Sequence, residues 1–188
     1  IEIGGSYEDQ QDMFGDLIML LIMIIILVYI VMASQFESFM SPFVIMFSIP
    51  FAFVGVLMGL YVTGTPLGAM GMIGILILMG IVVKNGIVLI DYTILMRERG
   101  HSVAEASVIA ANSRLRPILM TTLTTVLGMI PMAIGQGEGS EMWRSLGMVV
   151  AWGLSISTLV TLVIIPTVYA SMASWQERRA ARKAARNA

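Results

Sequence analysis

Lys84 is the residue whose type and position point most directly to chemistry, because it stands alone in a long apolar stretch. Forty-six uncharged residues separate it from Glu37, and the next six residues are also uncharged. A charge at the centre of a bilayer costs about 2.5–3.5 kcal/mol on insertion scales, so a partner must offset it. We interpret Lys84 as an ion-coupling residue that faces the interior of a helix bundle and pairs with a carboxylate. The alternative is a structural lysine that neighbouring groups neutralise.

Two polar residues on the same predicted helix, Asn85 and Asp91, are candidates to act with Lys84. Asp91 lies seven residues further along on the same face, but the rise of about 10 Å is too large for direct contact. We place Asp91 near the cytoplasmic interface. Asn85 either joins a hydrogen-bond network between helices or is an ordinary packing group. No other acidic residue lies inside a predicted span, so the partner of Lys84 is expected outside this chain.

Hydroxyl and guanidinium groups gather where a later span begins. Thr121, Thr125 and Gly128 share one helix face by their spacing, so Thr121 could hold water or relay protons. The alternative is that each threonine hydroxyl bonds to a carbonyl of its own helix. Arg114 and Arg116 flank the same segment, and orientation charges at the interface are an equally simple interpretation.

The sequence lacks the residues that disulfides, metal sites and hydrolytic catalysis would require. The chain has no cysteine and a single histidine, His101, so disulfides, cysteine-ligated metals, histidine metal sites and Ser-His-Asp triads are not expected. No HExxH motif and no pair of intramembrane aspartates supports an intramembrane protease. We therefore expect no catalytic residues, no cofactor and no metal site.

The amino-acid composition indicates whether the chain lies in water or in a membrane. Of 188 residues, 57% are hydrophobic and 12% are charged, with a mean hydropathy of +0.89. An ordinary soluble domain carries about 25% charged residues. A soluble enzyme, a nucleic-acid binder and a disordered regulator are therefore excluded, and the chain is expected to lie in a bilayer.

Charged residues divide the chain into long uncharged runs, and one run of 46 residues is too long for a single membrane helix of about 20 residues. The Gly-Thr-Pro turn at 64–66 divides this run into two. The prediction is an all-α bundle over 15–173, with a short cytoplasmic surface helix at 103–112 that begins with a capping box at Ser102 and Glu105. The predicted spans are Leu17–Ala33, Pro42–Val62, Leu67–Leu95, Pro117–Gln136 and Leu146–Met172.

Basic residues predict the orientation of the bundle. Nine Lys and Arg residues lie on one side, between the third and fourth spans and after the fifth, whereas Arg144 alone lies opposite. By the positive-inside rule, the nine are cytoplasmic, the N-terminus is periplasmic and the C-terminus is cytoplasmic. Residues 174–188 form a basic tail that is expected to contact anionic lipids through its charges and Trp175. Residues 1–14 resemble the end of a β-element of a periplasmic domain, so we expect the chain to be part of a longer protein.

Four segments, in order, resemble the resistance-nodulation-division (RND) family of efflux pumps. Gly80–Tyr92 is similar to the tenth membrane helix of these pumps, and Arg114–Thr122 is similar to the start of the eleventh. Gly137–Ser140 resembles the turn before the twelfth helix, and Gln35–Phe39 resembles the loop after the eighth. The chain thus resembles helices eight to twelve of an AcrB-like hydrophobe/amphiphile exporter.

The resemblance implies a proton-driven antiporter of the inner membrane that works as a homotrimer with a periplasmic adaptor and an outer-membrane channel. It implies that Lys84 pairs with two aspartates of the fourth helix, in the N-terminal half of the transporter. It also implies that Arg114 and Thr121 belong to the same proton relay, to which we add Asn85 and Asp91. Because this chain lacks the fourth helix and the porter domains, it is not expected to transport alone.

Three functions remain open beside multidrug or amphiphile efflux. An RND-superfamily lipid exporter and a protein-translocation accessory are the first two, and only the absent substrate domains would separate them. The third is a structural membrane bundle without transport, in which Lys84→Met would be harmless or stabilising. The Lys84-Asn85 pair favours the drug-type branch of the family over the metal-exporting branch.

Overall fold

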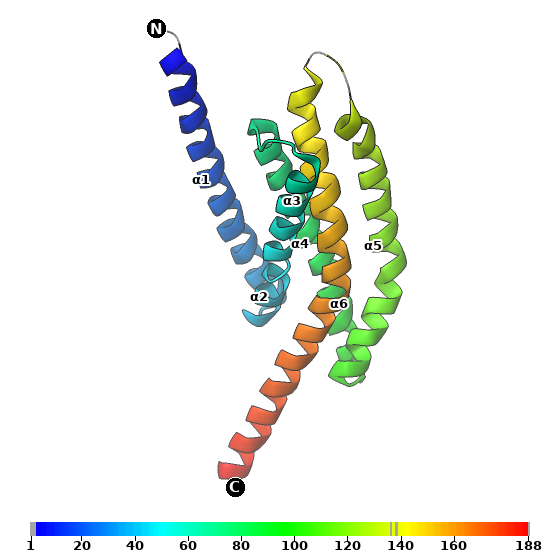
Figure 1. Cartoon of the computed structure of the whole chain (residues 1–188). Coiled ribbons are helices and arrows are strands. Elements are labelled where there is room, and N and C mark those ends of the chain that lie inside the picture. The colour runs from blue at the N-terminus through cyan, green and yellow to red at the C-terminus, as the bar shows by residue number, and fades with distance from the viewer. Residues whose placement is uncertain (1–2, 136, 138, 188) are drawn as a thin grey trace.

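The structure, a computed structural model, is a helical bundle in which five segments are long and apolar enough to cross a membrane (Figure 1). It describes the secondary structure of residues 3–135, 137 and 139–187. The burial and contacts of side chains are described for residues 11–135, 137, 139–175 and 179. Within these residues every regular element is an α-helix, which confirms the predicted fold class. The helices are α1 (Ile3–Phe36), α2 (Met40–Met46), α3 (Ile49–Thr63), α4 (Ala69–Glu98), α5 (Val103–Ile134) and α6 (Ser140–Asn187).

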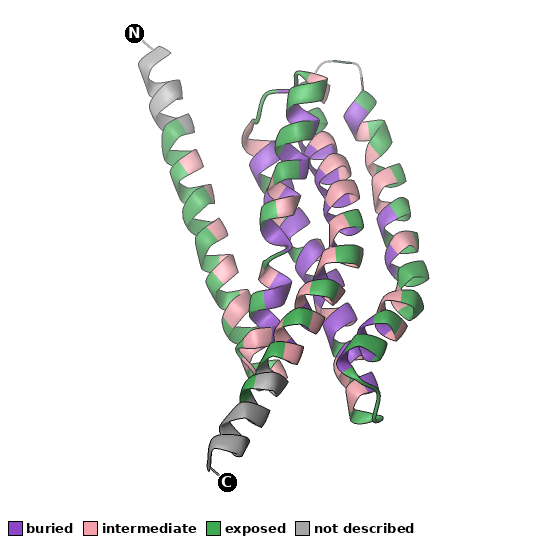
Figure 2. Ribbon diagram, turned by 60° about the horizontal axis from the view of Figure 1, so that its bottom comes forward, coloured by how far each residue is buried: buried purple, intermediate pink, exposed green. Residues whose placement is uncertain are grey.

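Helix α1 stands apart from the rest of the bundle at its N-terminal end and meets α2 and α4 near its C-terminal end (Figure 1). About half of its described apolar side chains are exposed and almost all the others are half-buried, as the colours of α1 in Figure 2 show. The sequence predicted the end of a β-element at the start of the chain. In the structure residues 3–5 are already helical and continue into the first span, while residues 1–2 lie outside the described residues.

The second predicted span is divided in two. α2 ends at Met46, and α3 begins at Ile49 with Pro50 in its first turn. Because proline has no backbone N–H and restricts the residue before it, the chain breaks here. The hydroxyl of Ser48 donates to the Ile45 carbonyl at 2.6 Å, which satisfies one carbonyl at the end of α2. The predicted turn that follows α3 is confirmed, with Gly64 in the left-handed region at φ 62°.

A tight turn joins α4 to α5. Ser102 and Glu105 form the predicted capping box, in which the Ser102 amide donates to the Glu105 carboxylate at 3.1 Å. The surface helix predicted at 103–112 is not separate, because it runs without interruption into the fourth span. No glycine or proline stops the helix between Val103 and Arg116, and Pro117 removes only one backbone donor.

Helix α6 is the centre of the bundle, packing against α3, α4 and α5. Glycines permit these close contacts. A Cβ at Gly55 would lie 3.1 Å from the Gly153 Cα, and one at Gly74 would lie 3.3 Å from the Leu146 carbonyl oxygen. With 48 residues, α6 is about 72 Å long, which exceeds a hydrocarbon core of about 30 Å. The predicted fifth span and part of the basic tail are therefore one helix.

We expect Gly59→Ala to destabilise the bundle by about 1–3 kcal/mol, because the added methyl group would collide with the side chain of Trp152. An SDS titration in mixed micelles, followed by tryptophan fluorescence, measures this change. Gly15→Ala is the matched control, since nothing lies within 4 Å of a Cβ at that helical position. Equal stability of the two variants would contradict the packing described here.

Candidate functional site

Lys84 and Asp91 lie on one exposed stripe of α4, which we call the α4 stripe. Its members recur at intervals of three, four or seven residues, the spacing of a single helix face. They are Ile73, Ile77, Gly80, Lys84, Asp91, Leu95 and Glu98, and all are exposed. The opposite face of α4 is buried in the bundle. The α4 stripe is therefore largely uncovered by the described helices, although at Gly80 it borders a narrow cavity that Ile24, Ile25 and Val28 of α1 also line.

Lys84 has no ion-pair partner among the described residues. Its neighbours on the α4 stripe toward the N-terminus of α4 are the apolar Ile77 and Gly80. A Cβ at Gly80 would meet nothing within 4 Å, and the cavity beside Gly80 is lined on its other side by Ile24, Ile25 and Val28 of α1. The partner expected for Lys84 must come from outside the described helices.

Asn85 and Lys84 lie on different sides of α4. Successive residues of an α-helix are about 100° apart, so the two neighbours point to different sides of α4. Asn85 is buried, and the adjacent Gly86 faces Ile45 and Ile165. The structure thus places Asn85 inside the packed bundle, whereas Lys84 and Asp91 share the uncovered face.

Arg114 of α5 contacts the aromatic ring of Tyr92 on α4. Its guanidinium carbon lies 4.7 Å from the centroid of the Tyr92 ring, within the range of a cation–π interaction. The Nε atom of Arg114 is buried and has no hydrogen-bond partner among the described residues. The sequence analysis interpreted Arg114 either as a relay residue or as an interfacial charge. It did not identify Tyr92 as the neighbour of Arg114. The structure brings Arg114 to the residue that follows Asp91.

Thr121 lies on an exposed face of α5, and its hydroxyl is bonded within its own helix. It donates to the Pro117 carbonyl at 3.1 Å and to the Ile118 carbonyl at 2.9 Å. Thr125 behaves in the same way, donating to the Thr121 carbonyl at 2.8 Å. The structure therefore brings Thr121 into no hydrogen bond with Lys84 or Arg114.

A buried hydroxyl pair, which the sequence analysis did not identify, links α5 to α6. The Oγ1 atoms of Thr122 and Thr158 lie 3.1 Å apart, and both residues are buried. Thr161 lies one turn further along α6, and its buried hydroxyl has no partner among the described residues. Four threonines occur between 121 and 125, and only the rotation of α5 decides which of them faces α6.

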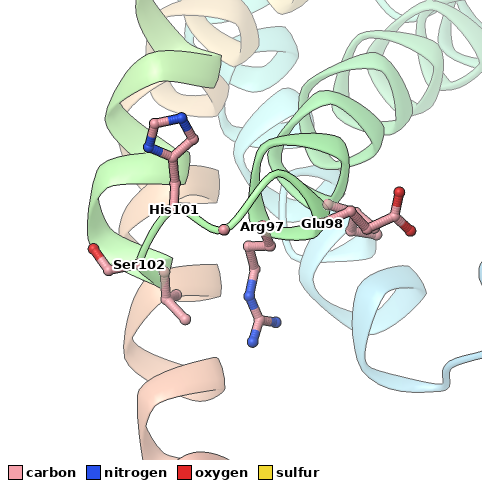
Figure 3. A pocket seen from close by; sticks show the side chains of 7 residues that line it. Arg97, Glu98, His101 and Ser102 are labelled. Atoms are coloured by element: carbon pink, nitrogen blue, oxygen red, sulfur yellow. The ribbon is translucent and has the colours of Figure 1, made fainter.

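The turn between α4 and α5 contains a pocket of about 490 Å³. Figure 3 shows that the side chains of Arg97, Glu98, His101 and Ser102 point in different directions around it. The Ser102 hydroxyl is engaged with Glu105 in the capping box. These side chains do not converge on a common point as the groups of a catalytic site must.

Comparison with known proteins identifies the family. The family model described as AcrB/AcrD/AcrF matches residues 1–173. The chain belongs to this family. Its members are RND efflux transporters, and the chain corresponds to part of their membrane region.

Relatives with different names share this segment. The swarming motility protein SwrC of Bacillus subtilis is 43% identical over 180 residues, covering 95% of this chain and 17% of SwrC. The cobalt-zinc-cadmium resistance protein CzcA of Cupriavidus metallidurans is 41% identical over 122 residues, covering 65% of this chain and 12% of CzcA. The multidrug resistance protein MdtC of Erwinia tasmaniensis is 39% identical over 140 residues, covering 74% and 14%.

The fold has a close counterpart among solved structures. A crystal structure of a heavy metal efflux pump aligns with a TM-score of 0.80 at 33% identity, covering 89% of this chain and 17% of that one. The chain thus spans about one sixth of the length of that pump. Its helices are arranged as in the matching part of an RND transporter.

We expect Thr122→Val to destabilise the bundle by about 0.6 kcal/mol, and by no more than about 1.7 kcal/mol, because it leaves the Thr158 hydroxyl without its partner. Thr124→Val is the matched control, since the Thr124 hydroxyl is exposed and bonds only to the Met120 carbonyl of its own helix. Unfolding of both variants in mixed micelles provides the comparison. A larger loss for Thr124→Val would contradict the assignment.

Proposed function

We propose that this chain is the C-terminal membrane portion of a proton-driven RND antiporter and that Lys84 is its coupling residue. One observation carries the proposal: a lysine within an apolar span lies on an uncovered helix face and lacks an ion-pair partner among the described residues. Leaving such a charge in hydrocarbon is costly. A second helix bearing carboxylates would offset that cost if it packed on the α4 stripe.

The proposed mechanism uses a change of partner. When a facing carboxylate is ionised, it pairs with Lys84 and holds its helix against α4. When a proton neutralises the carboxylate, this attraction is lost and Lys84 is free to find another acceptor. The two charge states then favour two arrangements of the membrane helices, which is how proton entry would drive a conformational cycle.

The other proposed relay residues have separate tasks. Asp91 would carry a proton-exchanging carboxylate on the α4 stripe toward the cytoplasm. Arg114 would supply a fixed positive charge beside it. Thr121 would act only after its hydroxyl turns from its own helix toward an incoming group, and Asn85 would stabilise the interior of α4 behind Lys84.

We propose multidrug or amphiphile export as the activity of the complete transporter, with the Lys84-Asn85 pair and the MdtC relative in support. The assembly would be a homotrimer in the inner membrane, joined to a periplasmic adaptor and an outer-membrane channel. Its N-terminal half would supply the acidic partner of Lys84. The N-terminus of this chain would be periplasmic and its C-terminus cytoplasmic, where Arg179 stacks 3.6 Å over the Trp175 ring and could meet membrane lipids.

Metal cation export is the second candidate. CzcA is named as a cobalt-zinc-cadmium resistance protein, and the aligned crystal structure is of a heavy metal efflux pump. Substrate choice in either case would be made outside this segment. A lipid exporter, a translocation accessory and a structural bundle are the remaining alternatives.

We expect Lys84→Ala to abolish energy-dependent efflux by a full-length transporter that carries this chain, because the other cation of α4, Arg97, lies in its last turn. Efflux of a fluorescent amphiphile is measured in cells that lack their own exporters, at matched membrane levels. Ile73→Ala is the control, since it shortens another exposed side chain of the α4 stripe and should retain efflux.

Equal efflux by wild type and Lys84→Ala would reject Lys84 as the coupling residue. Resistance to zinc and cobalt is measured in the same strains. Metal resistance that depends on Lys84, without amphiphile efflux, would favour the second candidate.

A further inference from the structure

We propose that Tyr92 is a positioning residue whose ring holds the guanidinium of Arg114 at the edge of the α4 stripe. The terminal N–H groups of Arg114 would then face a carboxylate on the helix that covers this stripe. This inference rests on the proposed function, because it assigns Arg114 to the proton relay. It adds to that function a residue outside the relay and a specific contact between α4 and α5.

The geometry supports a stacked rather than a hydrogen-bonded guanidinium. The Arg114 guanidinium carbon is 4.7 Å from the Tyr92 ring centroid. Both residues are half-buried, and the buried Nε atom of Arg114 has no hydrogen-bond partner in the part of the chain that the structure describes. A planar guanidinium is weakly hydrated and stacks well on an aromatic face, so the ring is the contact that fixes its orientation.

The position of Tyr92 on α4 explains why it can serve this role. It follows Asp91, a member of the α4 stripe, and is turned from it by about 100° around the helix. Tyr92 therefore lies at the border between the uncovered stripe and the side of α4 that meets α5. A guanidinium held there remains within reach of the stripe without occupying it.

The consequence is electrostatic. Arginine stays protonated at physiological pH, so Arg114 does not itself carry the transported proton. A fixed guanidinium instead stabilises the ionised form of a nearby carboxylate and so sets the pH at which that carboxylate gives up its proton. A guanidinium released from the ring would occupy several rotamers, and this effect would weaken.

The first test compares Tyr92→Phe with Tyr92→Leu in the full-length transporter. The first variant keeps the ring and removes the hydroxyl, whereas the second removes the ring. We expect Tyr92→Phe to retain both the rate of efflux and its pH profile. We expect Tyr92→Leu to lower efflux by roughly two- to five-fold and to move the pH profile, and we expect no further loss when it is combined with Arg114→Ala.

The second test does not depend on transport. Phenylglyoxal reacts with accessible guanidinium groups, and peptide mass spectrometry of labelled membrane vesicles reports the rate at Arg114. We expect Arg114 to react roughly two- to five-fold faster in Tyr92→Leu than in wild type, and at the wild-type rate in Tyr92→Phe. Tyr92→Met serves in place of Tyr92→Leu if the latter does not accumulate in the membrane.

The outcomes separate this proposal from the proposed function. Equal labelling of all variants would overturn the positioning of Arg114 by Tyr92, whatever Lys84→Ala does. A loss in Tyr92→Phe as large as that in Tyr92→Leu would overturn it as well, because the hydroxyl would then be the active group. Normal efflux by Lys84→Ala, together with faster labelling of Tyr92→Leu, would instead reject the proposed function and support the contact between ring and guanidinium.

Discussion

The cost of polar groups in hydrocarbon is the constraint on which this structure depends. The helical backbone avoids this cost, because its N–H and C=O groups form hydrogen bonds within each segment. Most hydroxyl groups avoid it too, as when Thr93 donates to the Leu89 carbonyl at 2.8 Å. Lys84 does not, because only another charged or polar group can offset the cost of its ammonium group in hydrocarbon. The described helices form a packed bundle in which Lys84 has no ion-pair partner and lies on one exposed face of α4.

Helix α4 packs into the bundle with the side opposite Lys84, so the face that carries Lys84 stays exposed. Small residues bring α4 and α6 together, since Gly71 meets Ser145, Gly74 meets Val149 and Gly153 meets Leu78. Ser145 also ties α6 to the loop before α4, because its hydroxyl donates to the Pro66 carbonyl at 3.1 Å. The rotation of α4 is therefore set by close contacts along one side, and Lys84, Asp91 and Glu98 lie on the other. The same packing that stabilises the bundle thus leaves Lys84 on the exposed face of α4.

The spans and turns could be read from the sequence because their signals are local. Charged residues bound the uncharged runs, and Ser102 and Glu105 mark the start of α5. Helix limits were harder to predict, since the sequence from 103 to 116 has no residue that stops a helix and Pro117 only weakens it. The contact of Arg114 with Tyr92 and the pair of Thr122 with Thr158 depend on how helices rotate against one another. Residues 22 and 36 positions apart in the chain carry no local sign of such contacts.

These tertiary contacts determine how far a change of charge at Lys84 can extend. The capped turn and the stacking of Arg114 on Tyr92 join α4 to α5 at two levels of the bundle. The hydroxyl pair joins α5 to α6 at a third level. On the proposed mechanism, a helix attracted to or released from the α4 stripe would therefore act on a connected unit of three helices rather than on α4 alone. Helix α1 contacts α2 and α4 and stands apart from the bundle at its N-terminal end, so it is the element of the described chain that is least constrained to follow. Because α1 contacts α4 directly, a displacement at Lys84 would reach α1 without passing through α5 or α6.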